Sequence, residues 1–536
     1  MTTRAPAAAA LALSLLLTSC GLVENLTGGN DATPTAEPSP QTGADQRERP
    51  RLPFVRQGRM SIEGGNDVTF ELTITNLEHN GEYLMLEVTH NYLEDLPGTV
   101  TGRNPPVRMV DPVSGEVLRF LRDSANNDEP YGTHFVPGDP HMPTHEGLPT
   151  TLRRYLPAPT QDARYLTLTG AGVGLIPGIP ITRVDEFTPA PEPNAHDYID
   201  PETFAQEPEL PDQIWYPDNP PPPALDTSGD RHTMESFVDN PTASTTRSGD
   251  QEVIALHADE MFAFDASTPT AEAAETIRAC ARTLRANIGP QGGEITIVGH
   301  TDDRGPSAYN QTLSRERAEA ARALLEEELG AEFTFTTEGR GSAEPLAAEG
   351  GPDDEQARAR NRRVEFTYQV PLDADGAAPT QDGLASARRH VADPAHFFDD
   401  PEPVTTLIHN DVDLHVYPMV RDGAYLFQMV GFQNSTLSPL EADLDVDESV
   451  IPGSPAQYTE GTLGGFRVHN PDTGLVRYVI RIRTGDGAYE DFADRINELA
   501  TGEQYLALAV FPAPAPDVTE MTLHAGAFGE VDVPIR

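Results

Sequence analysis

Residues 299–320 read GHTDDRGPSAYNQTLSRERAEA and follow an alternating run, EITIV, at 294–298. The alternation of apolar and polar residues predicts a β-strand. Asp302 then belongs to the loop at the C-terminal end of that strand. The rest of the stretch predicts a helix that starts with Ser307 as its N-cap and stops at Gly330. A strand, a short polar loop and a long helix therefore form the unit that decides the fold.

Three polar side chains of this unit are spaced so that they converge. Asn310 and Arg317 are seven positions apart, or two helical turns, so they share one face of the helix. Together with Asp302 they suit a ligand that carries an ammonium and a carboxylate on one carbon. Asp302 accepts hydrogen bonds from the ammonium, and Arg317 binds the carboxylate through its planar fork. A salt bridge between Asp302 and Arg317, which merely ties the loop to the helix, is the alternative.

The neighbouring segments predict a small α+β domain around this unit. Strands are expected at 252–256, 333–339 and 362–370, and a further helix at 270–288. The βαβαβ alternation implies a mixed sheet with helices packed on one side. We place the boundaries of this central domain at 248–371.

Several ordered blocks of this domain resemble a known family. The blocks are FAFD at 262–265, GHTDDRG at 299–305, YN at 309–310, LSRERA at 313–318 and NRRVEF at 361–366. They resemble the OmpA-like peptidoglycan-binding domain that is shared by OmpA C-terminal domains, peptidoglycan-associated lipoproteins and flagellar stator proteins. The resemblance covers about 248–370, and it implies noncovalent binding without a cofactor or a metal.

The resemblance also implies which residues form the binding site. Asp302 and Arg317 match the Asp of the HTD block and the Arg of the LSxxRA block, which in the family hold the diaminopimelate of the peptidoglycan stem peptide. The same resemblance adds to the lining of the pocket Asn310, Arg362, Thr301 and Asp265. His300 is expected to be a structural residue of the loop, because no second histidine stands at metal-ligand spacing.

The N-terminus predicts export and lipid anchoring. In residues 1–20, MTTRAPAAAALALSLLLTSC, Arg4 precedes an apolar stretch that is too short to span a membrane and fits a signal peptide. Its end resembles the lipobox of bacterial lipoproteins, in which Cys20 is lipidated. An ordinary signal peptide is the alternative. We expect an extracytoplasmic protein whose lipid enters the outer membrane if the host has one, and otherwise the outer face of the cell membrane.

Composition predicts three linkers and a buried cysteine. Residues 21–50 lack apolar periodicity and indicate a flexible tether. A Pro-rich linker is expected at 186–247, and another linker at 372–400. Cys280 falls in the pattern of the 270–288 helix and is expected to be a buried apolar residue.

The two outer segments, 51–185 and 401–536, contain similar motifs in the same order. GEYLMLEV at 81–88 recurs as GAYLFQMV at 423–430, VDPVSGEVLRFLR at 110–122 as HNPDTGLVRYVIR at 469–481, and LPAPTQDARYLTL at 156–168 as FPAPAPDVTEMTL at 511–523. Duplication of one fold explains this similarity. Short alternating strands with turn signals predict two related all-β sandwich domains that flank the central domain. A barrel is the alternative.

The net charge of the chain argues against one class of binding partner. The chain of 536 residues carries a formal net charge of -48, which argues against nucleic acid as a partner. We expect a lipid-anchored envelope protein that binds peptidoglycan and tethers the membrane to the cell wall. The outer segments show no catalytic motif, so no enzyme activity is expected. Two alternatives remain: a wall-targeted enzyme, or a surface adhesin or receptor whose β domains bind an unknown protein or glycan.

Overall fold

The computed structural model describes most of the chain beyond residue 50. The described residues are 51–62, 66–93, 100–101, 107–125, 129–133, 141–142, 148–159, 163–170, 172–194, 212–263, 265–350, 354–370, 395, 402–444, 462–471, 473–483, 489–496, 499, 501–502 and 504–536. The predicted signal peptide, Cys20 and the tether lie outside the described residues. So does the linker expected at 372–400, apart from Ala395.

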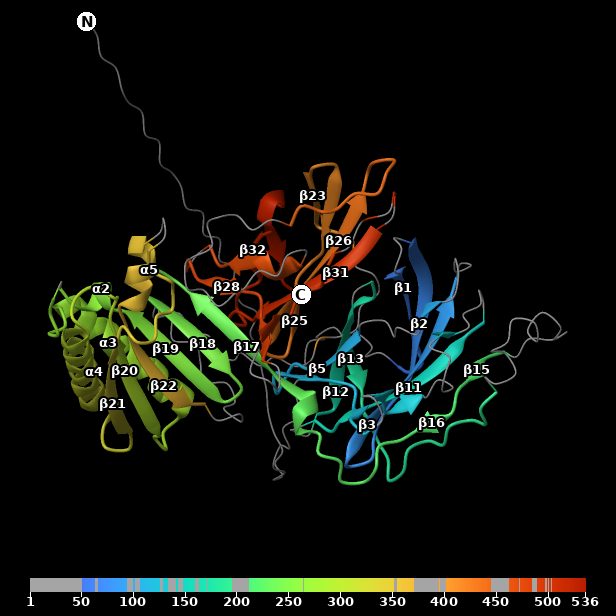
Figure 1. Cartoon of the computed structure of the whole chain (residues 1–536), viewed down its shortest axis with the longest axis horizontal. Coiled ribbons are helices and arrows are strands. Elements are labelled where there is room, and N and C mark those ends of the chain that lie inside the picture. The colour runs from blue at the N-terminus through green and yellow to red at the C-terminus, as the bar shows by residue number, and fades with distance from the viewer. Residues whose placement is uncertain are drawn as a thin grey trace, which may run out of the picture. The chain divides into compact units, whose positions relative to one another are not determined.

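The middle of the chain folds into a mixed sheet with two long helices, as its sequence predicts. Its strands and helices are β19 Gln251–His257, α2 Ala258–Met261, α3 Ala271–Ile288, β20 Glu294–His300, α4 Ser307–Leu329, β21 Thr334–Gly341, α5 Asp354–Asn361 and β22 Arg363–Gln369. The strand order is β19-β22-β20-β21. The pairing of β20 with β21 is parallel, whereas β22 runs antiparallel to both of its neighbours. The helices α3 and α4 pack side by side against this sheet (Figure 1).

The helix termini follow from local sequence with one correction. The side chain of Thr270 caps α3 by accepting from the backbone N–H of Ala273, and Gly330 ends α4 with a φ of 84°. The prediction that Ser307 caps α4 is wrong. Pro306 occupies the cap position, and Ser307 is the first helical residue without a side-chain capping bond.

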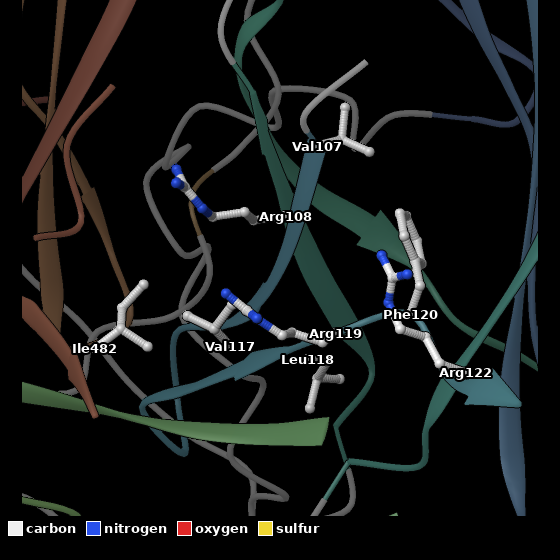
Figure 2. Close-up of a pocket in the computed structure, with 8 residues that line it drawn as sticks. All are labelled: Val107, Arg108, Val117, Leu118, Arg119, Phe120, Arg122 and Ile482. Atoms are coloured by element: carbon white, nitrogen blue, oxygen red, sulfur yellow. The ribbon is translucent and has the colours of Figure 1, made fainter. Parts of the chain in front are cut away.

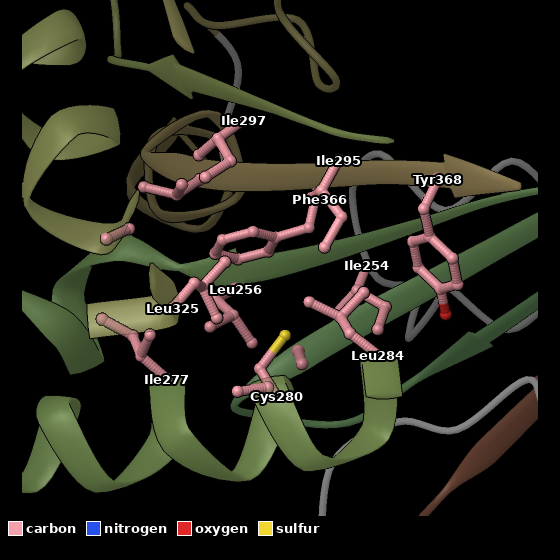
Figure 3. Close-up of a cluster of buried hydrophobic side chains, with 14 of the residues drawn as sticks. Ile254, Leu256, Ile277, Cys280, Leu284, Ile295, Ile297, Leu325, Phe366 and Tyr368 are labelled. Carbon is pink, nitrogen blue, oxygen red and sulfur yellow. The ribbon is translucent and has the colours of Figure 1, made fainter. Parts of the chain in front are cut away.

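The core of the middle region lies between the sheet and the two helices. Figure 3 shows Cys280 on α3 with its sulfur directed toward Phe366 of the sheet and other apolar side chains. Cys280 is completely buried, so its prediction as a core residue is confirmed. Burial raises the pKa of its thiol, which removes it as a nucleophile at neutral pH.

Helix α4 approaches the sheet closely because glycines stand beneath it. A Cβ atom on Gly299 of β20 would overlap the carbonyl oxygen of Ser314 on α4. A Cβ atom on Gly339 of β21 would overlap the backbone nitrogen of Arg315. The hydroxyl of Ser314 then accepts the backbone N–H of Gly341 at 2.9 Å. Gly299, which opens the GHTDDRG block, therefore sets the distance between the strand and the helix.

The region before residue 194 is built mainly from two sheets whose long strands pair antiparallel. Its main strands are β1 Phe54–Ile62, β2 Asn66–His79, β3 Tyr83–Tyr92, β5 Val107–Asp111, β6 Glu116–Leu118, β11 Thr150–Pro157, β12 Tyr165–Gly170 and β13 Gly174–Pro180. Its short strands are β4 Val100–Thr101, β7 Arg122–Asp123, β8 Glu129–Pro130, β9 Gly132–Thr133, β10 His141–Met142 and β14 Thr182–Arg183. In one sheet the neighbouring strands are β1, β2, β3 and β11, in that order. In the other sheet they are β13, β12, β5 and β6.

The region after residue 402 has the same strand order. Its strands and short helices are β23 Thr405–His409, β24 Val412–Val416, β25 Val420–Asp422, β26 Tyr425–Asn434, η3 Leu463–Gly465, β27 Arg467–His469, β28 Val476–Tyr478, β29 Arg481–Arg483, β30 Tyr489–Asp491, β31 Gln504–Pro512, β32 Glu520–His524, η4 Gly526–Phe528 and β33 Glu530–Pro534. Here β23, β24, β26 and β31 follow one another in one sheet, and β33, β32, β27 and β28 in the other.

The two β regions also share their registers. Tyr83 pairs with Pro157 in the first region, and Tyr425 pairs with Pro512 in the second. These residues occupy corresponding positions of the similar motifs. In each region the buried cluster of apolar side chains draws on both sheets, for example through Leu84 and Leu168 of β3 and β12 in the first.

One strand joins all three regions and corrects the prediction of a linker at 186–247. That segment contains β15 Ile214–Trp215, β16 Asp218–Asn219, η2 Ser228–Asp230, β17 Arg231–Asp239 and β18 Ala243–Ser248. Strand β17 pairs with β18, which lies next to the middle sheet. It also pairs with β6 of the first β region and with β28 and β29 of the second. The abundant Ser and Thr obscured these strands in the sequence, although Thr and Phe favour strands.

The close approach of α4 generates a testable prediction. In Gly299→Ala the added methyl group collides with the backbone of α4, so the helix must shift away from β20, at a cost of about 1–3 kcal/mol. Amide hydrogen exchange of peptides that cover β20 and α4 measures this loss. Gly229→Ala is the control, because a Cβ atom there meets nothing within 4 Å. Unchanged protection of β20 and α4 in Gly299→Ala would contradict the role of Gly299.

Candidate functional site

The candidate site lies where β20 ends and α4 begins. Thr301 is buried, and its backbone N–H donates to the carbonyl of Gly341 at 2.9 Å. Its hydroxyl donates to the carbonyl of Asp302, also at 2.9 Å. Thr301 thus fixes the first residue after the strand through bonds inside the protein, and its role is to position the loop.

Asn310 holds the loop from the helix side. Its side chain is 3% exposed, and its amide group donates to the carbonyls of Asp302 and Arg304 at 3.2 and 3.1 Å. Two hydrogen bonds from one buried amide fix the backbone on both sides of residue 303. Asn310 therefore orients Asp302 from one turn into the helix.

Arg362 binds the carboxylate of Asp302. Its Nη1 donates to Oδ2 of Asp302 at 2.6 Å. The same guanidinium makes a bidentate pair with Asp259, at 2.7 and 2.6 Å, and donates to Glu355 at 3.0 Å. These hydrogen bonds, that to Asp259 foremost, raise the pKa of Arg362. The other oxygen of Asp302, Oδ1, accepts the backbone N–H of Arg304 at 3.3 Å and has capacity for a further donor.

Arg317 is buried but has no carboxylate partner among the described residues. Its Nε donates to the carbonyl of Ala266 at 3.0 Å, and its guanidinium lies 5.1 Å from the centre of the Phe262 ring. Its two terminal nitrogens make no hydrogen bond within the described part of the chain. Burial lowers the pKa of Arg317, which Asp259 and Asp302 oppose through their charge, so these groups lie near one another. The guanidinium remains charged at neutral pH.

Asp265 lies at the edge of this arrangement. It has a positive φ of 59°, and its carboxylate accepts the hydroxyl of Tyr309. That bond raises the pKa of the half-exposed Tyr309. Asp265 therefore supports the exposed face of α4 and makes no described hydrogen bond to Arg317.

The structure contradicts one of the two sequence-based interpretations of Asp302 and Arg317, the salt bridge between them. They do not form a salt bridge: Asp302 pairs with Arg362, and the ion-pairing groups of Arg317 stay unpaired within the described residues. His300 is the last residue of β20 and is completely buried, 3.5 Å from Glu365, in agreement with a structural role.

Sequence reasoning missed Asp259 and Glu355, which complete the surroundings of Arg362. The spacing of both residues along the sequence could have indicated that they belong to the site. Asp259 follows a predicted strand by three residues, and Glu355 precedes Arg362 by seven, the spacing of a shared helix face. The helix α5, which carries Glu355, was not predicted, because it is short and consists mainly of polar and charged residues.

The described residues contain neither a group of metal-binding side chains nor a helix suited to cross a membrane. They contain no group of three or more His, Cys, Asp or Glu side chains that could hold a metal ion. Among them there is also no helix with the length and apolarity required to cross a membrane.

Comparison with known proteins identifies the middle region. The sequence model of the OmpA family matches residues 261–362. The chain is 37% identical over 113 residues to outer membrane protein A of Bordetella avium, a match that covers 21% of this chain and 55% of that protein. It is 33% identical over 110 residues to the peptidoglycan-associated lipoprotein of Legionella pneumophila, covering 20% of this chain and 59% of the relative.

These matches span less than two thirds of both relatives. A solved structure, the cell wall anchor of the T6SS from Pseudomonas aeruginosa, is 30% identical with a TM-score of 0.21, over 24% of this chain and 88% of that one. The residues matched by the family model include the loop after β20, helix α4 and Arg362. Residues 261–362 therefore form a domain of the OmpA family within a longer chain.

Proposed function

We propose that the OmpA family domain binds peptidoglycan noncovalently, by holding the diaminopimelate of the stem peptide between Asp302 and Arg317. We propose further that a lipid on Cys20 anchors the chain in the cell envelope, so that the protein tethers a membrane to the cell wall. The proposal assigns binding to this site and no bond-breaking step.

The observation that carries the proposal is that Arg317 is buried while its terminal nitrogens have no described partner. Arg317 is only 5% exposed, and a buried guanidinium usually has a carboxylate partner, because removing an unpaired charge from water is costly. Here Ala266 and Phe262 hold its position, while the terminal nitrogens have no described partner. A ligand carboxylate can receive two parallel hydrogen bonds from this planar fork.

Asp302 supplies the complementary charge for the ligand. Its Oδ2 is held by Arg362, which fixes the direction of Oδ1. An ammonium group that binds Oδ1 also experiences the negative charge of Asp259 and Glu355, which share Arg362 with Asp302. One zwitterionic centre can therefore place its ammonium on Asp302 and its carboxylate on Arg317.

Similarity supports the same ligand class. The Legionella pneumophila relative, which is 33% identical over 110 residues, is called a peptidoglycan-associated lipoprotein. By the resemblance of GHTDDRG and LSRERA to the motifs of the family, Asp302 and Arg317 match the residues that hold diaminopimelate there. A lipid and a wall-binding site on one chain would reinforce each other through effective concentration.

We also infer that the two β regions are copies of one sandwich fold. Support comes from the shared strand order and from the registers at Tyr83 and Tyr425. In this proposal they act as spacers or adhesion modules for an unknown protein or glycan, and β17 fixes them to the wall-binding domain.

Sedimentation with purified peptidoglycan tests the site. Asp302→Ala and Arg317→Ala should each weaken binding at least about tenfold, because each removes charge-assisted hydrogen bonds worth about 1.5–3 kcal/mol. The matched controls are the exposed neighbours Asp303→Ala and Arg315→Ala, which should bind as the unaltered chain does. If Asp302→Ala and Arg317→Ala sediment normally while folded, the assignment of the site is wrong.

Asn310 is predicted to act as a positioning residue. In Asn310→Ser the shorter side chain cannot reach the carbonyls of Asp302 and Arg304, so hydrogen exchange of the loop should rise and wall binding should weaken. Thr312→Ala, on the exposed face of the same helix, is the control. Weaker binding with unchanged loop exchange would show that Asn310 does not act through the loop.

Lipid anchoring is tested separately from wall binding. Cys20→Ser should move the chain from the membrane fraction to the soluble fraction and abolish metabolic labelling by a fatty acid. Its affinity for isolated peptidoglycan should stay unchanged, since residue 20 lies far outside the matched domain in sequence. Retention of the label in Cys20→Ser would contradict the anchor.

A further inference from the structure

A cavity outside the OmpA family domain is lined by arginine and apolar side chains. It has a volume of about 350 Å³ and lies beside β5 and β6 of the first β region, with one wall residue from β29. Its lining consists of Val107, Arg108, Val117, Leu118, Arg119, Phe120, Arg122 and Ile482 (Figure 2). The volume falls in the range of about 300–1,000 Å³ that is typical of small-molecule sites.

The charge of this cavity is opposite to that of the chain as a whole. Three guanidinium groups line it, whereas the chain carries a formal net charge of -48. No acidic side chain is among the lining residues. In Figure 2 the side chains of Arg108 and Arg119 lie toward Ile482, and Arg122 lies beside Phe120. A cavity with this lining attracts an anion that the rest of the surface repels.

Two of the arginines have protein partners, of which the exposed partner of Arg119 can be replaced by an anionic ligand, whereas the partner of Arg108 is 5% exposed and stays in place. Arg119 pairs with Glu490 at 3.2 Å, and both side chains are about half exposed, at 49% and 47%. Arg108 lies 3.5 Å from Asp494 and 5.3 Å from the centre of the Phe492 ring. Exposed ion pairs contribute about 0–1 kcal/mol. Exchange of Glu490 for a ligand oxyanion therefore costs little.

The corresponding arginines of the second β region have different hydrogen-bond partners. By motif correspondence Arg108 and Arg122 match Arg467 and Arg481. Arg481 hydrogen-bonds to Glu235 of β17, and Arg467 to His524 of its own sheet. Strand β17 pairs with β6 of the first region as well as with β28 and β29 of the second, so the two regions differ in the partners of these arginines and not in their contact with β17.

We propose that this cavity is a binding site for a small anionic molecule that carries a carboxylate or phosphate group next to an apolar moiety. The guanidinium groups of Arg108 and Arg119 bind the oxyanion, whose geometry matches their planar forks. Val117, Phe120 and Ile482 bind the apolar moiety. The site is independent of the proposed wall binding, because it shares no residue with the OmpA family domain.

Calorimetric titration of the full chain carrying Cys20→Ser tests this site. The probes are phenyl phosphate, phenylpropanoate, the neutral phenylpropanol and inorganic phosphate. At least one of the two aromatic anions should bind about tenfold or more tightly than phenylpropanol and inorganic phosphate, and added salt should weaken it. The preferred anion distinguishes a phosphate ligand from a carboxylate ligand.

Two matched variants locate the binding. Arg119→Ser should weaken the preferred probe about tenfold, which corresponds to one lost charge-assisted pair. Arg322→Ser on α4 removes an ion pair of similar exposure, 43% and 45%, outside the cavity, and should leave the affinity unchanged. The proposal is overturned if neither aromatic anion binds, if phenylpropanol binds equally well, or if Arg119→Ser has no effect.

Discussion

The close packing of α4 on β20 and β21 is the constraint on which the candidate site depends. Gly299 and Gly339 leave room for the helix backbone, and Ser314 fastens it to Gly341. At this distance the first turns of α4 reach the loop that follows β20. Asn310 can then bond two loop carbonyls, and Arg317 can reach Ala266 on the far side. A wider spacing would break both sets of contacts.

The site follows from an uneven distribution of ion pairs. Arg362 takes three carboxylates, whereas Arg317, deeper in the protein, has no described carboxylate partner. In the proposed function, a ligand carboxylate supplies the partner that Arg317 lacks among the described residues. The protein already fixes Asp302 through Arg362, so the ammonium of the same ligand would meet a carboxylate that is held in place.

Local sequence predicted the middle fold and the shared face of Asn310 and Arg317, because strand alternation and helical spacing are local patterns. It could not predict which partner Asp302 takes, since Arg362 lies 60 residues away in sequence and the two meet only when β22 enters the sheet beside β20. Strand β17 was missed for a similar reason. Its Ser- and Thr-rich neighbourhood resembles a linker, and pairing with three regions makes it a strand.

Binding of a soluble stem peptide tests the central claim most directly. Calorimetric titration should compare a peptide that contains diaminopimelate with one that contains lysine at the same position, because lysine keeps the side-chain ammonium and lacks the carboxylate beside it. If Arg317 binds that carboxylate, the diaminopimelate peptide should bind about tenfold or more tightly. Equal affinity for the two peptides would contradict the account.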